Sequence, residues 1–206
     1  GRGVVQDDKE AVKWFRKAAE QGDVGAQYNL GYMFANGRGV VQDDKEAVKW
    51  FRKAVEQGDV EAQYNLGYMF ANGRGVVQDD KEAAKWYRKA AEQGFGKAQY
   101  NLAVRYDDGQ GVTQDYKEAA KWYLKAAKQG YAKAQINLGF MFGKGTGVLQ
   151  DSVVAHMWSN IAGANGSKLG AKNRAKIEKK MTPAQIAEAQ KLAKECMKSK
   201  YKKCGQ

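Results

Sequence analysis

The sequence has little of what metal sites, catalytic triads and disulfide frameworks require. Its 206 residues include one histidine, two cysteines and one proline. A single histidine cannot supply a cluster of imidazole ligands, and it leaves little for a Ser-His-Asp arrangement. No run of about 18 apolar residues is present, so the sequence predicts no membrane-spanning helix. We therefore expect no enzyme, no metal and no cofactor.

Positive charge is also unevenly distributed along the sequence. The formal net charge is +12, yet residues 1–108 are balanced overall, and residues 109–206 carry the whole excess. A lysine-rich stretch of this kind can bind an anionic surface or polymer, such as nucleic acid, lipid headgroups or cell wall. Aromatic residues are not interleaved with the lysines of residues 168–203 in the way that base stacking requires. Nucleic acid is therefore the less favoured of these ligands.

What the sequence does have is repetition. GRGVVQD at residues 1–7 returns at 37–43 and 73–79, and GQGVTQD and GTGVLQD follow at 109–115 and 145–151. The spacing is 36 residues each time. A fixed period of this length is typical of a solenoid, in which each unit packs mainly on its neighbours.

Each unit is predicted to contain two helices joined by a glycine turn. In residues 26–34, Leu30 and Phe34 fall on one helical face, with Gly31 on its flank where another helix can approach closely. Gly37 is expected to end this helix in a left-handed conformation. The unit is therefore an antiparallel helical hairpin.

The second helix of the unit has its own start and stop signals. Asp43 is predicted to accept from the backbone N–H three residues on, while Glu46 reaches back to complete a capping box. Trp50 and Phe51 lie in the apolar stripe of this helix, and Gly58 closes it.

The letters A-Q-Y-N-L-G-Y-M-F, G-R-G-V and A-V-K-W-F-R-K-A, with a closing Q-G, resemble the Sel1-like repeat family, which is related to tetratricopeptide repeats. The resemblance covers essentially the whole chain. It implies an all-α, right-handed α-solenoid of antiparallel helical hairpins with a 36-residue period and a C-terminal capping helix pair. It also implies a non-enzymatic scaffold, often bacterial and often extracytoplasmic, that holds a partner protein.

The period divides the chain into six segments. Because the first segment has no first helix, Trp14 is expected to lack part of its packing, and we expect more repeats or a cap upstream in the natural protein. In the diverged repeat, His156 is assigned a packing role. The segments are 1–23, a partial repeat; 24–59, 60–95 and 96–131, regular repeats; 132–167, a diverged repeat; and 168–206, a cap with a lysine-rich tail that is expected to fray.

The family's groove-lining positions transfer onto the first helix of each unit. Recurrent tyrosines at these positions suit a binding surface, because each buries a large ring and keeps a polar end. Recent duplication could equally have copied tyrosines that only brace the helices. The asparagines Asn29, Asn65, Asn101 and Asn137 are expected to hydrogen bond a neighbouring turn. The candidate partner-binding residues on the concave face are Tyr28, Tyr32, Asn36, Glu61, Tyr64, Tyr68, Asn72, Lys97, Tyr100, Asp108 and Phe140.

The two cysteines, Cys196 and Cys204, both lie in the tail. Along one straight helix they would be about 12 Å apart, too far for a disulfide. If the helix ends near Ser199 and the chain folds back, the pair can close. Cysteine-rich members of the family bridge the same C-x7-C spacing, which favours a disulfide and a periplasmic or secreted location, with the cytoplasm as the alternative. The S-x-x-K string that begins at Ser199 is attributed to chance.

Two functions remain open from the sequence. The leading hypothesis is a protein–protein interaction scaffold that binds a partner peptide or helix on its concave face. The alternative is a binder of an anionic surface or polymer that acts through the basic C-terminal half.

Overall fold

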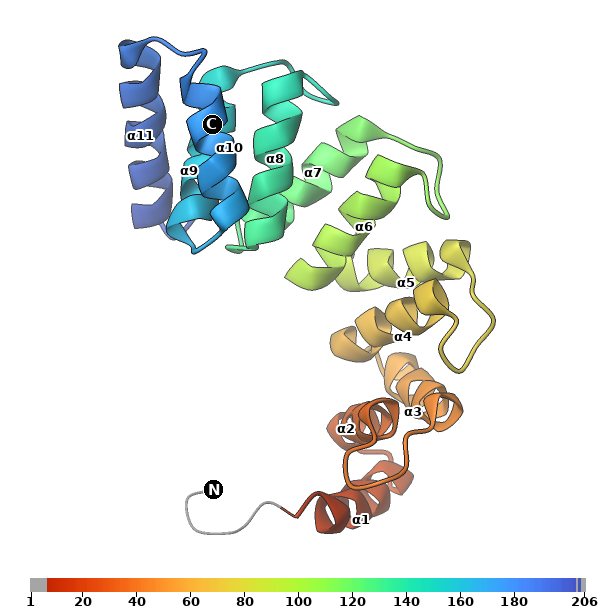
Figure 1. The fold of residues 1–206 in the computed structure, drawn as a ribbon. Helices are drawn as coiled ribbons and strands as arrows, with labels where there is room; N and C mark the ends of the chain where they lie inside the picture. The colour runs from red at the N-terminus through yellow and green to blue at the C-terminus, as the bar shows by residue number, and fades with distance from the viewer. Residues whose placement is uncertain (1–6, 203, 205–206) are drawn as a thin grey trace. The chain divides into compact units, whose positions relative to one another are not determined.

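A computed structural model describes residues 7–202 and residue 204, and the elements of this described part are all α-helical (Figure 1). The chain divides into two compact units, residues 1–95 and 96–206. Consecutive hairpins pack in chain order within each unit, as in an α-solenoid. Among the described residues, none of the helices combines the length and apolar character needed to cross a bilayer.

The first unit contains a lone second helix followed by two hairpins. Helix α1 packs on α2, α2 pairs with α3, α3 packs on α4, and α4 pairs with α5. The bounds are α1 Asp8–Glu20, α2 Val24–Asn36, α3 Asp44–Glu56, α4 Val60–Asn72 and α5 Asp80–Glu92.

The second unit contains two hairpins and a cap. Helix α6 pairs with α7, α7 packs on α8, and α8 pairs with α9, which carries both α10 and α11. The bounds are α6 Gly96–Asp108, α7 Tyr116–Ala127, α8 Ala132–Lys144, α9 Ser152–Ala164, α10 Lys168–Glu178 and α11 Pro183–Lys198.

Aspartate caps start the second helices, as predicted, but the capping box is not formed. Asp43 Oδ1 accepts from the backbone N–H groups of Lys45 and Glu46 at 2.9 and 3.0 Å. The Asp43 N–H donates to the Phe34 carbonyl at 3.0 Å, so it is not available to the Glu46 carboxylate. Glu46 instead accepts from Lys49 Nζ at 3.1 Å.

Glycines end the first helices and permit close packing inside the hairpins. Gly37 follows α2 with φ of 65°, which confirms the predicted left-handed cap. A Cβ atom on Gly31 would lie 2.8 Å from the ring of Phe51. The expected close approach of a second helix at Gly31 is therefore confirmed.

Packing of the tryptophans differs between α1 and the later second helices. Trp50 in α3 is 3% exposed, whereas Trp14 at the same position of α1 is 62% exposed. Trp50 lies on α3, which packs against α2, the first helix of the same hairpin. The sequence has no first helix to pair with α1 in this way. The expected loss of packing at Trp14 is therefore confirmed.

The C-terminal segment forms a helix with a folded-back end. Thr182 caps α11, and its reciprocal bonds with Gln185 form the predicted capping box. After α11 the chain turns back through Lys200 and Tyr201, both with positive φ, and Cys196 is bonded to Cys204. The disulfide is confirmed.

The expectation of a fraying tail is wrong for residues 199–202 and 204. Tyr201 Oη donates to Asn165 Oδ1 at 3.1 Å, which ties the turn to the end of α9. Cys204 is completely buried. Residues 199–202 and 204 are therefore held by the disulfide and by the bond from Tyr201 to Asn165.

Candidate functional site

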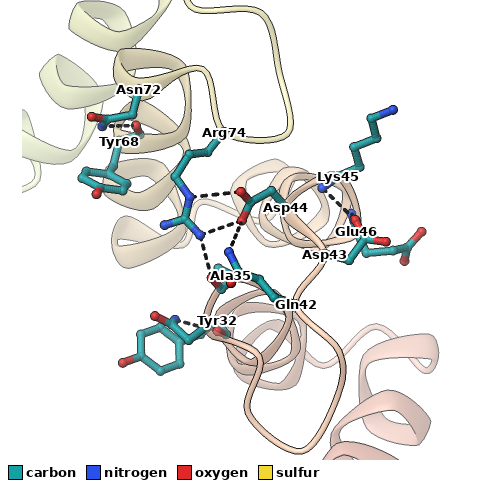
Figure 2. Close-up of polar contacts among 11 residues, drawn as sticks. Tyr32, Ala35, Gln42, Asp43, Asp44, Lys45, Glu46, Tyr68, Asn72 and Arg74 are labelled. Carbon is teal, nitrogen blue, oxygen red and sulfur yellow. Dashed lines mark hydrogen bonds and ion pairs between the residues drawn. The ribbon is translucent and has the colours of Figure 1, made fainter.

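The tyrosines of α2 and α4 form two classes with different exposure. Tyr32 and Tyr68 are 41% and 40% exposed, because they lie away from the buried stripe of their helices. Figure 2 shows both rings on the same side of the Arg74 side chain. We call the surface formed by Tyr32 and Tyr68 the tyrosine face.

The other tyrosines of the predicted set are half-buried among aromatic rings. The centroid of Tyr28 lies 6.1 Å from that of Phe51, and Tyr64 lies 5.7 Å from Tyr87. In the second unit Tyr100 repeats this contact with Tyr123 at 5.8 Å. These three tyrosines therefore support the hairpins with most of their ring surface.

Burial also changes the acidity of these tyrosines. Desolvation, followed by the negative charge of Glu61, raises the pKa of the Tyr28 phenol. Desolvation likewise raises the pKa of Tyr100, with Tyr131 as the next cause. Both phenols therefore stay neutral and can donate hydrogen bonds at neutral pH.

Asparagines on these helices hydrogen bond differently from the expectation. The Nδ2 atoms of Asn29 and Asn65 donate to the carbonyls four residues earlier, at 2.8 and 3.0 Å. The predicted bond to a neighbouring turn is therefore wrong for these two residues. Asn65 also lies near enough to the Tyr28 phenol to lower its pKa, against the larger effect of burial, so the first helices of neighbouring repeats approach each other here.

Beside the tyrosine face, Arg74 joins two consecutive repeats (Figure 2). Its guanidinium donates to both carboxylate oxygens of Asp44 at 2.6 and 3.1 Å, and to the Ala35 carbonyl at 2.7 Å. The hydrogen bond from Arg74 lowers the pKa of Asp44. The hydrogen bond to Asp44 is the main cause that raises the pKa of Arg74, and nearby Tyr68 raises it further. The clamp fixes the turn that follows α4 onto the hairpin before it.

The turn approaches that hairpin closely at a second point. Gly75 has φ of 68°, and a Cβ atom there would overlap the carbonyl oxygen of Asp44. Both the conformation and the space therefore require glycine.

One repeat earlier, the same contact is weaker. Arg38 Nη2 donates to Asp8 Oδ1 at 3.2 Å, a single bond between more exposed side chains. A hollow of about 270 Å³ lies here, lined by Asp8, Phe15, Tyr32 and Arg38 among others. Tyr32 therefore stands beside an accessible depression.

In the second unit the predicted Phe140 stands between two hollows. It is 38% exposed and lines a hollow of about 340 Å³ with Asp107 and Lys144. It also lines a pocket of about 250 Å³ with lysines of α8 and α10. Burial is the main cause that raises the pKa of Asp107, which accepts from Tyr123 Oη at 3.2 Å.

The remaining predicted residues are polar and exposed. The Nδ2 atoms of Asn36 and Asn72 donate to the carbonyls of Tyr32 and Tyr68, each at 2.8 Å. These bonds lie within the last turn of each helix. The exposed charged residues are Glu61 on α4 and, in the second unit, Lys97 and Asp108 on α6.

The single histidine and the serine of the S-x-x-K string are engaged in contacts within the chain. His156 is fully buried, and its Nε2 lies 2.8 Å from Glu178 Oε1. Ser199 Oγ donates to the Cys196 carbonyl at 2.8 Å. No group of three metal-ligating side chains occurs among the described residues.

The sequence analysis missed the Arg74 clamp and the lysines around Phe140. A usable signal was present, because arginine and aspartate recur 30 residues apart in Arg38 with Asp8 and in Arg74 with Asp44. At the same spacing Asp80 is followed by Gln110, and both charged types are absent at Ser152 with Thr182. The two pairs that keep both charges form the contact.

Comparison with known proteins agrees with the repeat pattern. The model of the Sel1 repeat family matches residues 1–23, 24–59, 60–95, 96–131 and 132–167. The search of curated proteins gives no significant match.

Solved structures with the same repeats are similar to this chain. A Sel1 repeat protein from Oxalobacter formigenes is 38% identical with a TM-score of 0.77, over 84% of this chain and 50% of that protein. A protective antigen of uropathogenic Escherichia coli with an SLR fold is 28% identical with a TM-score of 0.50, over 97% and 59%. Cysteine rich protein B of Helicobacter pylori is 27% identical with a TM-score of 0.50, over 65% and 97%. The chain therefore spans about half of the first protein and three-fifths of the second.

Proposed function

Because this chain belongs to the Sel1 repeat family, whose members are generally protein-interaction scaffolds without catalytic activity, we propose that it binds a segment of a partner protein on its tyrosine face. This is the side of the first helices that the family resemblance assigns to the concave surface. The partner segment would be an extended peptide or a helix.

The exposure of Tyr32 and Tyr68 is the observation that carries this proposal. Two tyrosines one repeat apart are left about 40% exposed on helices whose other large side chains are buried or half-buried. Tyrosine is enriched among the residues that dominate binding energy at protein interfaces. The rings have few rotatable bonds, so binding them costs little conformational entropy.

Rigid support beneath the tyrosines favours the same function. Arg74 bonds the turn after α4 to Asp44 of α3 and to the Ala35 carbonyl of α2. These contacts fix α2 relative to α4 before any ligand arrives. Such preorganisation lowers the cost of binding.

An extracytoplasmic location is part of the proposal. The disulfide between Cys196 and Cys204 supports it, because such bonds persist mainly in oxidising compartments.

Selection of peptides from a random library, followed by calorimetric titration, tests the proposed surface. Peptides enriched by the wild-type chain should lose at least about tenfold in affinity for the Tyr32→Ala, Tyr68→Ala variant, since each ring is expected to be an anchor. Tyr116→Ala is the matched control, because Tyr116 is 41% exposed but begins a second helix. Equal affinity of the wild type and the double variant would refute the tyrosine face.

A further inference from the structure

The pocket around Phe140 has an apolar floor and a basic rim. Phe140 and Ile177 supply the floor, while Lys144, Lys176 and Lys180 supply three ammonium groups. The three lysines are exposed, and no acidic residue lines the pocket. We call this the lysine pocket; it lies among α8, the start of α9, and α10.

The lysine pocket lies at the position of the repeat at which Arg74 bonds Asp44 and Ala35 in the first unit. Three periods of 36 residues separate the two places, so each residue of the clamp has a counterpart 108 positions later. The counterparts are Phe140 for Tyr32, Gly143 for Ala35, Gln150 for Gln42, Ser152 for Asp44, Lys176 for Tyr68, Lys180 for Asn72 and Thr182 for Arg74. Six of these seven counterparts line the pocket, and Thr182 is the exception. Gln150 also donates a hydrogen bond to the Gly143 carbonyl at 3.0 Å.

Both partners of the ion pair are lost at this place. Ser152 replaces the carboxylate of Asp44, and Thr182 replaces the guanidinium of Arg74. Thr182 is occupied as the N-cap of α11, where its N–H donates to Gln185 Oε1 at 2.9 Å. The place that holds an internal ion pair in the first unit therefore has none here, and three lysines line the pocket instead.

Nearby carboxylates are engaged elsewhere. Asp151 accepts from the backbone N–H groups of Val153 and Val154 at the start of α9. Glu178 is bonded to His156 and lies 3.5 Å from Arg174. Burial raises the pKa of Asp107, and nearby Lys144 partly opposes this effect. The Asp107 carboxylate accepts its hydrogen bond from Tyr123. In the described part of the chain, none of the three lysines forms an ion pair with a carboxylate.

Size and chemistry together restrict the occupant. About 250 Å³ is smaller than the roughly 300–1,000 Å³ of typical small-molecule sites, so the pocket suits one or two side chains. A phosphodiester backbone would satisfy the lysines but would leave the apolar floor uncovered. A segment that places an acidic side chain beside an apolar one satisfies both.

We propose that the lysine pocket binds an acidic segment of a partner protein, with a Glu or Asp carboxylate among Lys144, Lys176 and Lys180 and a neighbouring apolar side chain on Phe140 and Ile177. This assignment rests on the proposed function, because it takes the partner to be a protein. It adds a second site, in the second unit, with its own partner chemistry.

Fluorescence anisotropy with a labelled peptide of four Glu-Glu-Leu repeats tests the site. Replacing Lys144, Lys176 and Lys180 with Gln should weaken binding at least about tenfold, since three charge pairs with the peptide are lost together. The control variant replaces Lys191, Lys194 and Lys198 of α11 with Gln, which removes the same charge from another helix. Its loss should be no more than about threefold, the effect of net charge alone.

A single substitution provides an independent test. Ser152→Asp restores the residue that Asp8, Asp44 and Asp80 hold at this position of other repeats, at the first position of the second helix. The chain should fold normally, because acidic residues are favourable in the first turn of a helix. The new carboxylate would form ion pairs with the pocket lysines within the chain. Binding of the Glu-Glu-Leu peptide should therefore fall by about tenfold or more. Unchanged binding would contradict the pocket.

Further peptides and ligands separate the alternatives. Equal losses for the two lysine variants would overturn the pocket in favour of net charge. A peptide of Glu-Glu-Ser repeats that binds as well as Glu-Glu-Leu would overturn the apolar floor. Stronger, pocket-dependent binding of a thymidine oligonucleotide or of phosphatidylglycerol vesicles would overturn the assignment to a protein segment.

The two proposed sites can fail separately. The Tyr32→Ala, Tyr68→Ala variant should bind the Glu-Glu-Leu peptide as the wild type does, because its substitutions lie in the first unit. Loss of binding in that variant would refute an independent lysine pocket.

Discussion

Asp44 and Arg74 join neighbouring repeats by charge in the first unit. Their side chains are 26% and 29% exposed, so their attraction is less screened by water than that of a surface pair. Asp44 is also the first residue of α3, where a negative charge stabilises the helix end. A substitution at this residue therefore tests the clamp only if the helix-end effect is controlled.

Asp44→Asn should lower the free energy of unfolding by about 1 kcal/mol at neutral pH. The Asp44 pKa is lowered in the folded state, so its stabilisation is present above the unfolded pKa of about 3.9 and is lost as pH falls through the folded value. The difference between wild type and variant should therefore shrink in acid. Urea unfolding at neutral and acidic pH measures it.

Asp8→Asn is the control for this prediction. Asp8 begins α1 and accepts a 3.2 Å bond from Arg38, which is longer than the 2.6 Å bond from Arg74 to Asp44. This variant loses the same helix-end charge but a weaker clamp, so its effect should be smaller. An equal effect would mean that the helix end, and not the clamp, accounts for the loss.

Gly75→Ala should destabilise the first unit by more than Gly58→Ala. Both glycines have positive φ, so each substitution carries the strain of a left-handed conformation, about 1–2 kcal/mol. A Cβ atom at Gly58 meets nothing within 4 Å, whereas one at Gly75 overlaps the Asp44 carbonyl. Comparison of the urea midpoints isolates the close approach. Equal midpoints for the two variants would show that the turn moves away freely.

At the scale of elements, helix starts and stops were predictable because they depend on residues close in sequence. Asp43 and Gly37 act as the expected caps, and Thr182 forms the expected box. The bonding of Glu46 was not predictable from the local pattern, since the Asp43 N–H it would need donates across the turn to Phe34.

The candidate site was less predictable than the helices. The sequence proposed five equivalent tyrosines, but neighbours from other helices decide their exposure. Phe51 and Tyr87 cover parts of Tyr28 and Tyr64, and leave Tyr32 and Tyr68 open. Arg74 and Asp44 lie 30 residues apart, and their contact depends on how consecutive hairpins stack. The Arg74 contact follows from packing between repeats, and the aromatic contacts follow from packing between the two helices of one hairpin.

The end of α11 is the element whose order depends on a covalent bond. The disulfide joins residues 8 apart, with Cα atoms 4.8 Å from each other. Cys196→Ser with Cys204→Ser should speed amide exchange in the last turn of α11 and at Tyr201, because a loop of this size is stabilised by about 2–3 kcal/mol. Hydrogen exchange followed by mass spectrometry measures this change. Unchanged exchange would mean that the bond from Tyr201 to Asn165 is sufficient to hold the turn.

At the scale of the whole molecule, the two units offer different chemistry for binding. The first unit has balanced charge and exposes Tyr32 and Tyr68. The second unit carries the whole net charge of +12 and contains the lysine pocket. Repetition supplied the same framework to both units, and substitutions at equivalent positions gave each its own surface. A partner that contacts both units would present an aromatic-binding part and an acidic part.

The most direct test of the central claim is hydrogen exchange of the wild-type chain with and without a peptide selected for binding to the first unit. Exchange should slow in α2 and α4, whose exposed tyrosines would be covered, and should change little in α3 and α5. Slower exchange confined to α3 and α5, with α2 and α4 unchanged, would contradict the account, because the peptide would then bind the opposite side of the hairpins.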